Sequence, residues 1–137
     1  MELQSAVKRL QRLAEQNPDD VRVPEYLGLA LHTLAAHRLE MGDPAGAERE
    51  LERSRGLLEP LYQANPRKLT RLRDLADCYQ VFGDLHASRL EWKLAHLAYQ
   101  KSLDLWERWK QVGVSSIYDQ QHRALAARLV AQAAMKF

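Results

Sequence analysis

The sequence predicts an all-α protein built of antiparallel helix hairpins, and three observations support this prediction. Long stretches are rich in Leu, Ala, Glu, Arg and Gln, which favour helix. Apolar residues recur at helical spacing, and no stretch alternates β-branched residues in the way that is typical of strands. Turn signals divide the chain at Asn17-Pro18, Gly42-Asp43-Pro44, Asn65-Pro66 and Gly113 to Ser116. We therefore expect helices over roughly 2–16, 20–41, 44–64, 68–89, 92–111 and 117–135.

Each expected helix has an apolar stripe of its own. The stripes, in chain order, are Leu3, Val7 and Leu10; Leu27, Leu31 and Leu34; Leu51, Leu58 and Leu61; Leu75, Tyr79 and Phe82; Tyr99, Leu105 and Trp106; and Leu125, Leu129 and Val130. Pro44 suits a first helical position, and Ser116 with Asp119 forms a capping-box pattern. Pro60 lies inside the third expected helix, so we expect a kink or local break there, between Gly56 and Pro60.

The composition is that of an ordinary globular domain. The chain has 137 residues, of which 46% are apolar and 28% charged, and this suits a single domain over residues 1–137. Twenty Lys and Arg against 18 Asp and Glu give a net charge of +2, far from the basic excess of a dedicated nucleic-acid-binding protein. No apolar run is long enough to span a membrane. We expect a cytoplasmic protein without nucleic-acid or membrane partners.

Two stretches of the chain match when it is shifted by 48 residues without a gap. Asn17-Pro18 falls on Asn65-Pro66 and Ala47 falls on Ala95, while the apolar positions of the helices between them coincide. The sequence thus predicts a half repeat at 2–16, repeats at 17–64 and 65–112, and a capping helix at 116–136. Because the half repeat lacks a first helix, we expect the chain to be a fragment of a longer array. The alternative is a native capping helix that shares the phase.

The spacing within each repeat resembles that of the tetratricopeptide family. The matching positions are Leu34-Ala35, Ala47, Leu51 and Ser54 in one repeat and Phe82-Gly83, Ala95, Tyr99 and Ser102 in the next. Small residues in that family lie where two helices cross. The departures are a unit of 48 residues instead of about 34, and a second turn, Leu90-Glu91-Trp92, without glycine. The resemblance implies a right-handed α–α superhelix, which is a solenoid of stacked hairpins.

In the tetratricopeptide family, the first helix of each pair lines a concave groove that binds a peptide or a partner protein. The resemblance therefore implies a non-catalytic interaction module without a cofactor. The groove positions that it implies, together with the neighbouring Arg73, are Leu29, His32, Ala36, Leu39, Asp77, Gln80, Asp84 and Ser88. Two alternatives stay open: an enzyme or small-ligand receptor with a pocket between helices, and a pure oligomerisation module.

A narrower resemblance concerns the stretch from Tyr99 to Trp106, followed by Trp109-Lys110 and a glycine turn. It resembles the end of the repeat regions that follow kinase domains in bacterial eukaryotic-like serine/threonine kinases. This implies a sensor or docking segment of a larger signalling protein, with a kinase upstream. The chain itself contains no Gly-rich loop, His-Arg-Asp triplet or Asp-Phe-Gly motif.

Residue types that could bind a metal or catalyse a reaction are scattered along the sequence. His32 and His37 are five residues apart, which places them on different faces of a helix. Cys78 takes the place of Ala30 in the previous repeat, as expected of a small core residue. We therefore predict no metal site and no catalytic residue.

Basic residues gather at the start of the fourth expected helix, where the helix dipole disfavours them. They are Arg67, Lys68, Arg71 and Arg73. A solvated face would explain them, and so would the docking of an acidic peptide or a phosphorylated segment. Asp74 and Asp77 nearby argue against DNA or RNA.

The two ends of the array carry different expectations. Trp106 and Trp109 are expected to be covered by the final helix. The first helix lacks a hairpin partner, so its apolar residues would leave a side uncovered; they are Leu3, Val7, Leu10 and Leu13. Exposed apolar stripes tend to find a partner. We expect association through residues 2–16, either as a homodimer or with a preceding repeat of a longer protein.

Overall fold

The computed structural model describes residues 2–112 and 116–137, and within these ranges it contains six α-helices and no strand. The helices are α1 (Glu2–Gln16), α2 (Arg22–Glu40), α3 (Pro44–Ala64), α4 (Leu69–Ser88), α5 (Trp92–Val112) and α6 (Ile117–Ala134). Every helix begins and ends within about two residues of its predicted bounds. The all-α prediction is therefore confirmed, while the turn predicted at Gly113 to Ser115 lies outside the described residues.

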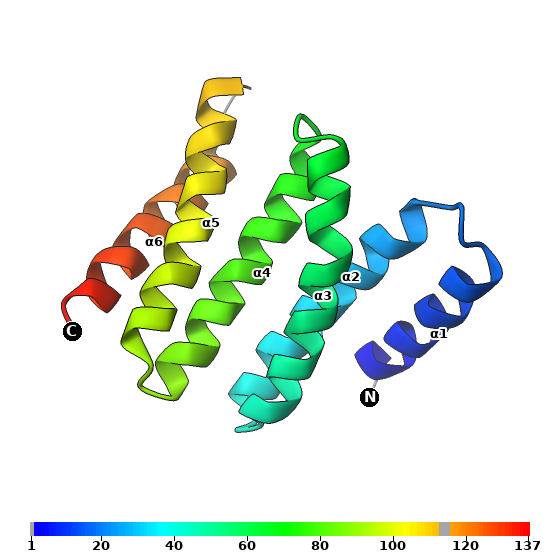
Figure 1. Cartoon of the computed structure of the whole chain (residues 1–137), viewed down its shortest axis with the longest axis horizontal. Coiled ribbons are helices and arrows are strands. Elements are labelled where there is room, and N and C mark those ends of the chain that lie inside the picture. Colours follow the sequence, from blue (N-terminus) through cyan, green and yellow to red (C-terminus); the bar gives the residue numbers. More distant parts are fainter. Residues whose placement is uncertain (1, 113–115) are drawn as a thin grey trace.

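Each helix packs against the next one along the chain, and α2 also contacts α4. In Figure 1 the helices lie in a row from α1 to α6, with α2 passing behind α3 and α6 behind α5. The main core is centred on α4, whose buried residues include Leu72, Leu75, Ala76, Val81 and Leu85. Smaller apolar clusters join α1 to α2 and α5 to α6.

Residues predicted to lie at helix crossings or in the core are buried. Ala47 and Ala95 are fully buried, as the close approach of two helix backbones requires. Trp106 is buried in the same cluster as Ala126 of α6, whereas Trp109 is only partly buried against it. Cys78 is buried as well, and burial raises the pKa of its thiol to about 12. Its position is that of a core residue, as predicted.

The two hairpin turns have the same backbone conformation at positions 48 residues apart. Gly42 and Leu90 both adopt a left-handed conformation, with φ of 78° and 60°. The equivalent hydrogen bonds are Gly42 N to Leu39 O and Asp43 N to Arg38 O in the first turn, and Leu90 N to Ala87 O and Glu91 N to His86 O in the second. The missing glycine of the second turn is therefore replaced by a leucine in the conformation that glycine prefers.

Replacing Leu90 by glycine should stabilise the protein by about 0.5–1 kcal/mol, since a side chain in the left-handed region costs about 1 kcal/mol or more. Leu90 is 73% exposed, so little packing is lost. The converse change, Gly42→Ala, should destabilise although a Cβ there would meet nothing within 4 Å. Urea unfolding followed by circular dichroism measures both changes. A lower midpoint for Leu90→Gly would contradict the strained turn.

Of the kink or local break expected at Pro60, the break is wrong, because α3 continues without interruption from Pro44 to Ala64; a kink there stays a prediction. Proline has no N–H, so the carbonyl of Gly56 lacks its helical partner. Gly56 and Pro60 are both exposed, and a Cβ built on Gly56 would meet no atom within 4 Å. The helix tolerates the proline because water can reach the freed carbonyl at the surface.

The uncovered apolar side expected for the first helix is also wrong. Val7 is only 5% exposed, and Leu3 and Leu10 pack with it against the cluster formed by α2. The reason is that the apolar stripe predicted for α2, formed by Leu27, Leu31 and Leu34, packs in one cluster with Val7, while Ala35 of α2 belongs to the main core. Of the four residues in the expected stripe, only Leu13 is exposed. Association through residues 2–16 stays a prediction, but without an exposed stripe to support it.

Candidate functional site

The groove residues predicted on α4 share one side of that helix, because three or four residues separate each from the next. They are Arg73, Asp77, Gln80, Asp84 and Ser88, and none of them is buried. Arg73 forms an ion pair with Asp119 of α6 at 2.8 Å. Asp84 accepts a hydrogen bond from the hydroxyl of Tyr99 of α5 at 2.5 Å. This side of α4 therefore faces α6 and α5.

The basic residues at the start of α4 are held by carboxylates of neighbouring helices. Lys68 and Arg71 lie 2.8 and 2.7 Å from a carboxylate oxygen of Glu25 in α2. Their hydrogen bonds lower the pKa of Glu25 even though burial opposes this change. Arg73 is held in the same way by Asp119. Three of the four cations thus join helices to one another, which explains their position without an acidic partner.

The start of α6 fixes the carboxylate that holds Arg73. The backbone N–H of Asp119 donates to Ser116 Oγ at 3.1 Å, and the backbone N–H of Ser116 donates to Asp119 Oδ2 at 3.2 Å. This confirms the predicted capping box. The Arg73 guanidinium lies 4.9 Å from the ring centre of Tyr118, and this ring lies 4.0 Å from that of His122. A charged and aromatic group thereby links α4 to α6.

Two carboxyl groups of α4 lie next to this link and define what we call the acidic junction. It consists of Asp74 and Asp77 of α4, Glu25 of α2, and Tyr118 and His122 of α6. The Oδ1 atom of Asp77 lies 3.9 Å from Nδ1 of His122. That nitrogen is buried and has no hydrogen-bond partner among the described residues. The junction thus brings ionisable groups from three helices together.

Burial dominates the protonation of the acidic junction. It raises the pKa of Asp74 to about 6, and the negative charges of Asp77 and Glu25 add to the effect. It also raises the pKa of Asp77 to about 6, although Arg73 acts in the opposite direction. Neither carboxyl accepts a hydrogen bond from another described residue. A cation or a hydrogen-bond donor supplied from outside the chain would therefore stabilise both charged forms.

The groove residues predicted on α2 are less uniform. Leu29 is exposed, while Ala36 and Leu39 are partly buried against the main core. His32 is only 6% exposed, so its expected place on a binding surface is wrong. Burial lowers the pKa of its imidazole to about 4, and its Nε2 has no hydrogen-bond partner among the described residues. His32 is a neutral core residue.

The exposed side of α2 includes two residues that the sequence analysis missed. Tyr26, which is 60% exposed, and Thr33 lie three residues before and four residues after Leu29. This spacing places all three on one side of the helix. The spacing of Tyr26, Leu29 and Thr33 is visible in the sequence, but helical periodicity did not show which of two adjacent sides of α2 contacts α4.

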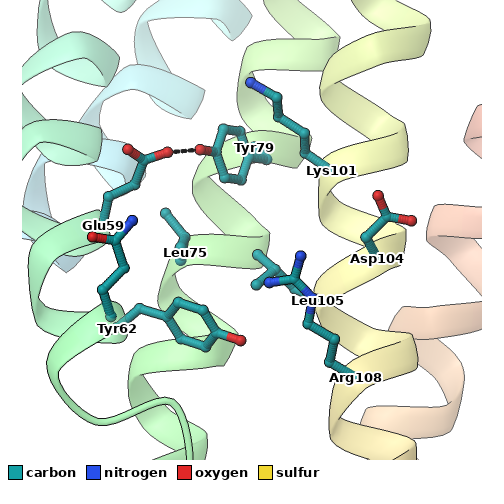
Figure 2. Close-up of a pocket in the computed structure, with 9 residues that line it drawn as sticks. Glu59, Tyr62, Leu75, Tyr79, Lys101, Asp104, Leu105 and Arg108 are labelled. Atoms are coloured by element: carbon teal, nitrogen blue, oxygen red, sulfur yellow. Dashed lines mark hydrogen bonds between the residues drawn. The ribbon is translucent and has the colours of Figure 1, made fainter.

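A second surface, on the opposite side of α4, has no counterpart in the sequence analysis. Asp77 and Tyr79 are two residues apart and thus about 200° apart around the helix. The side chain of Tyr79 belongs to a cavity of about 300 Å³ between α3 and α5. Figure 2 shows Glu59 and Tyr62 on one side of it, Lys101, Asp104 and Arg108 on the other, and Leu75 and Tyr79 between them. The Tyr79 hydroxyl donates to the carboxylate of Glu59.

No group of three or more His, Cys, Asp or Glu side chains that could hold a metal ion occurs among the described residues. His86 has one carboxylate neighbour, Glu91, at 3.1 Å from its Nδ1. Within the described ranges, no helix is both long enough and apolar enough to cross a membrane.

Comparison with known proteins finds no matching family model, no matching curated protein and no matching solved structure.

Proposed function

We propose that the chain is a non-catalytic protein-interaction module made of tetratricopeptide-like repeats, in which α2–α3 and α4–α5 are successive repeats. The support comes from the two hairpin turns, which repeat their left-handed residue and their hydrogen bonds at an interval of 48 residues. In this proposal α2, α4 and α6 line the concave side of a right-handed superhelix. The kinase-associated signalling role that the second resemblance implies stays a prediction.

The observation that supports binding is the pair of carboxyls in the acidic junction. Asp74 and Asp77 are half-buried, have raised pKa values and receive no hydrogen bond from the described residues. A lysine or arginine of a partner would supply the missing donors and favour the charged carboxylates. Tyr26 follows Glu25 in α2 and Tyr118 precedes Asp119 in α6; both side chains are exposed and offer apolar contact. We therefore propose that a peptide segment with a basic residue binds there.

One observation favours the enzymatic alternative. Asp77 and His122 form a close pair with shifted pKa values, which is an arrangement that acid–base catalysts use. Catalysis also needs an enclosed space for a substrate, and neither Asp77 nor His122 lines the cavity between α3 and α5. The interaction module accounts for the carboxyl pair without such a cavity.

The proposal is tested by selecting binders from a random 12-residue peptide display library and comparing two double variants. Asp74→Asn/Asp77→Asn should weaken the selected peptides by about tenfold or more, since charged pairs shielded from water contribute strongly to binding. The control Glu15→Gln/Asp19→Asn removes the same charge from exposed positions and should leave binding unchanged. Selected peptides without Lys or Arg, or with equal affinity for both variants, would overturn the proposal.

A further inference from the structure

The cavity between α3 and α5 continues into a second one of about 210 Å³ along α4, and the two share Tyr79 and Lys101. We call the combined surface the α3–α5 trough. Its floor is formed by side chains of α4, namely Leu75, Tyr79, Phe82 and His86. These positions are separated by three or four residues, so the floor follows α4 for about 16 Å. That length corresponds to three turns of a helix.

The walls of the trough have the spacing of helices that receive another helix. On α5 the wall includes Leu94, Leu97, Lys101, Asp104 and Arg108, and on α3 it includes Glu52, Arg55, Glu59 and Tyr62. Both rows alternate steps of three and four residues, which is the spacing of side chains that interlock between packed helices. Leu97 is 57% exposed, although apolar residues on the packing side of a helix usually contact a neighbouring helix.

The charged side chains of the α3 wall have partners within the chain, whereas the cations of the α5 wall form no ion pair with the described residues. On α3, Glu52 pairs with Arg55, and Glu59 accepts the hydrogen bond of Tyr79. On α5, Lys101 and Arg108 form no ion pair with any residue in the described part of the chain; Lys101 lies 5.3 Å from the Tyr79 ring centre. These two cations are seven residues apart and therefore share one side of α5. Asp104 lies between them on the same side and accepts a hydrogen bond from Gln100, so the α5 wall has a net charge of +1, whereas Glu59 leaves the α3 wall with a net charge of −1.

We propose that the α3–α5 trough binds an amphipathic helix of a partner protein that has acidic residues along the edge facing α5. Apolar side chains of this helix enter the two cavities, one beside Leu75 and one beside Phe82 and Leu97. Leu75 and Phe82 are seven residues apart on α4, so the two apolar anchors are separated by about two turns. Carboxylates on the adjacent edge pair with Lys101 and Arg108. This surface is separate from the acidic junction and requires a partner of opposite charge.

The test uses a display library of 18-residue amphipathic helices with fixed leucines at two-turn spacing and randomised flanking positions. The selected sequences should be enriched in Asp and Glu on one flank. Lys101→Glu/Arg108→Glu should weaken them by about tenfold or more. The control, Lys110→Glu/Arg128→Glu, makes the same charge change at exposed positions outside the trough and should have no effect. Leu97→Asp should also abolish binding, whereas Met41→Asp should not.

Three outcomes would overturn the proposal. The first is a set of selected helices that is neutral or basic. The second is binding that persists in Lys101→Glu/Arg108→Glu but is lost in Asp74→Asn/Asp77→Asn, which would place the helix at the acidic junction. The third is self-association of the chain in sedimentation equilibrium that Leu97→Asp abolishes, which would make a second copy the occupant. The Lys101→Glu/Arg108→Glu variant changes the trough and the Asp74→Asn/Asp77→Asn variant changes the acidic junction, and these two surfaces lie on opposite sides of α4. An experiment can therefore contradict helix binding in the trough without contradicting peptide binding at the acidic junction.

Discussion

Leu58→Ala should lower the free energy of unfolding by about 2–5 kcal/mol, the range for leucine truncation in a closed core. Leu58 is 1% exposed and packs against α2 at Gly28, where an added Cβ would lie 2.5 Å from its Cδ2 atom. Gly28→Ala alone should also destabilise, by roughly 1–3 kcal/mol, because the added methyl group would force the buried Leu58 side chain to shift. In each case the packing of α3 against α2 determines the effect.

The effects of Gly28→Ala and Leu58→Ala should depend on each other, because the two residues are in contact. In the Leu58→Ala background, Gly28→Ala should become stabilising, because its methyl group fills part of the void and alanine favours helix over glycine by about 1 kcal/mol. Gly56→Ala is the control, since a Cβ there meets nothing within 4 Å, and it should stabilise in both backgrounds. Urea unfolding of the four Gly28/Leu58 combinations measures the coupling. Additive effects at these two positions would contradict the close contact.

Asp74→Asn/Asp77→Asn should stabilise the protein at neutral pH, by about 2 kcal/mol after allowance for solvent screening of half-buried groups. Both carboxyls have a folded-state pKa of about 6, above the ordinary value of 3.8. The folded protein therefore binds more protons than the unfolded chain between these two values. Consequently, this contribution to stability is present at low pH and is lost as the pH rises through about 6.

A pH series of urea midpoints checks this prediction. The difference between the variant and the native protein should be small at pH 4 and should grow in favour of the variant until about pH 7. His32, with its lowered pKa of about 4, acts in the opposite direction over the same range, but it is common to both proteins and does not affect their difference. A constant difference across the series would show that Asp74 and Asp77 titrate at ordinary values.

The sequence was sufficient for the helices because their ends are set by local chemistry. Pro44 at a first helical position and the Ser116–Asp119 capping box act within one turn, and both are present as predicted. The burial of Ala47 and Ala95 followed from spacing alone. These features need no knowledge of how the hairpins are placed relative to one another.

The candidate sites depend on that placement, and the sequence predicted them only in part. Asp77 was predicted as a groove residue, but its raised pKa depends on burial, and that of Asp74 depends also on Glu25 from a distant part of the chain. His32 was misplaced because periodicity does not show which of two adjacent sides of α2 becomes buried. The α3–α5 trough was missed because it depends on how far two helices separate across a third.

The most direct test of the interaction-module proposal is an amide NMR titration of the chain with a basic peptide from the 12-residue selection. We predict that shift changes concentrate at Tyr26, Leu29, Asp74, Asp77 and Tyr118, and that they vanish in Asp74→Asn/Asp77→Asn. Changes confined to the α3–α5 trough, or unaltered in that variant, would contradict binding at the acidic junction.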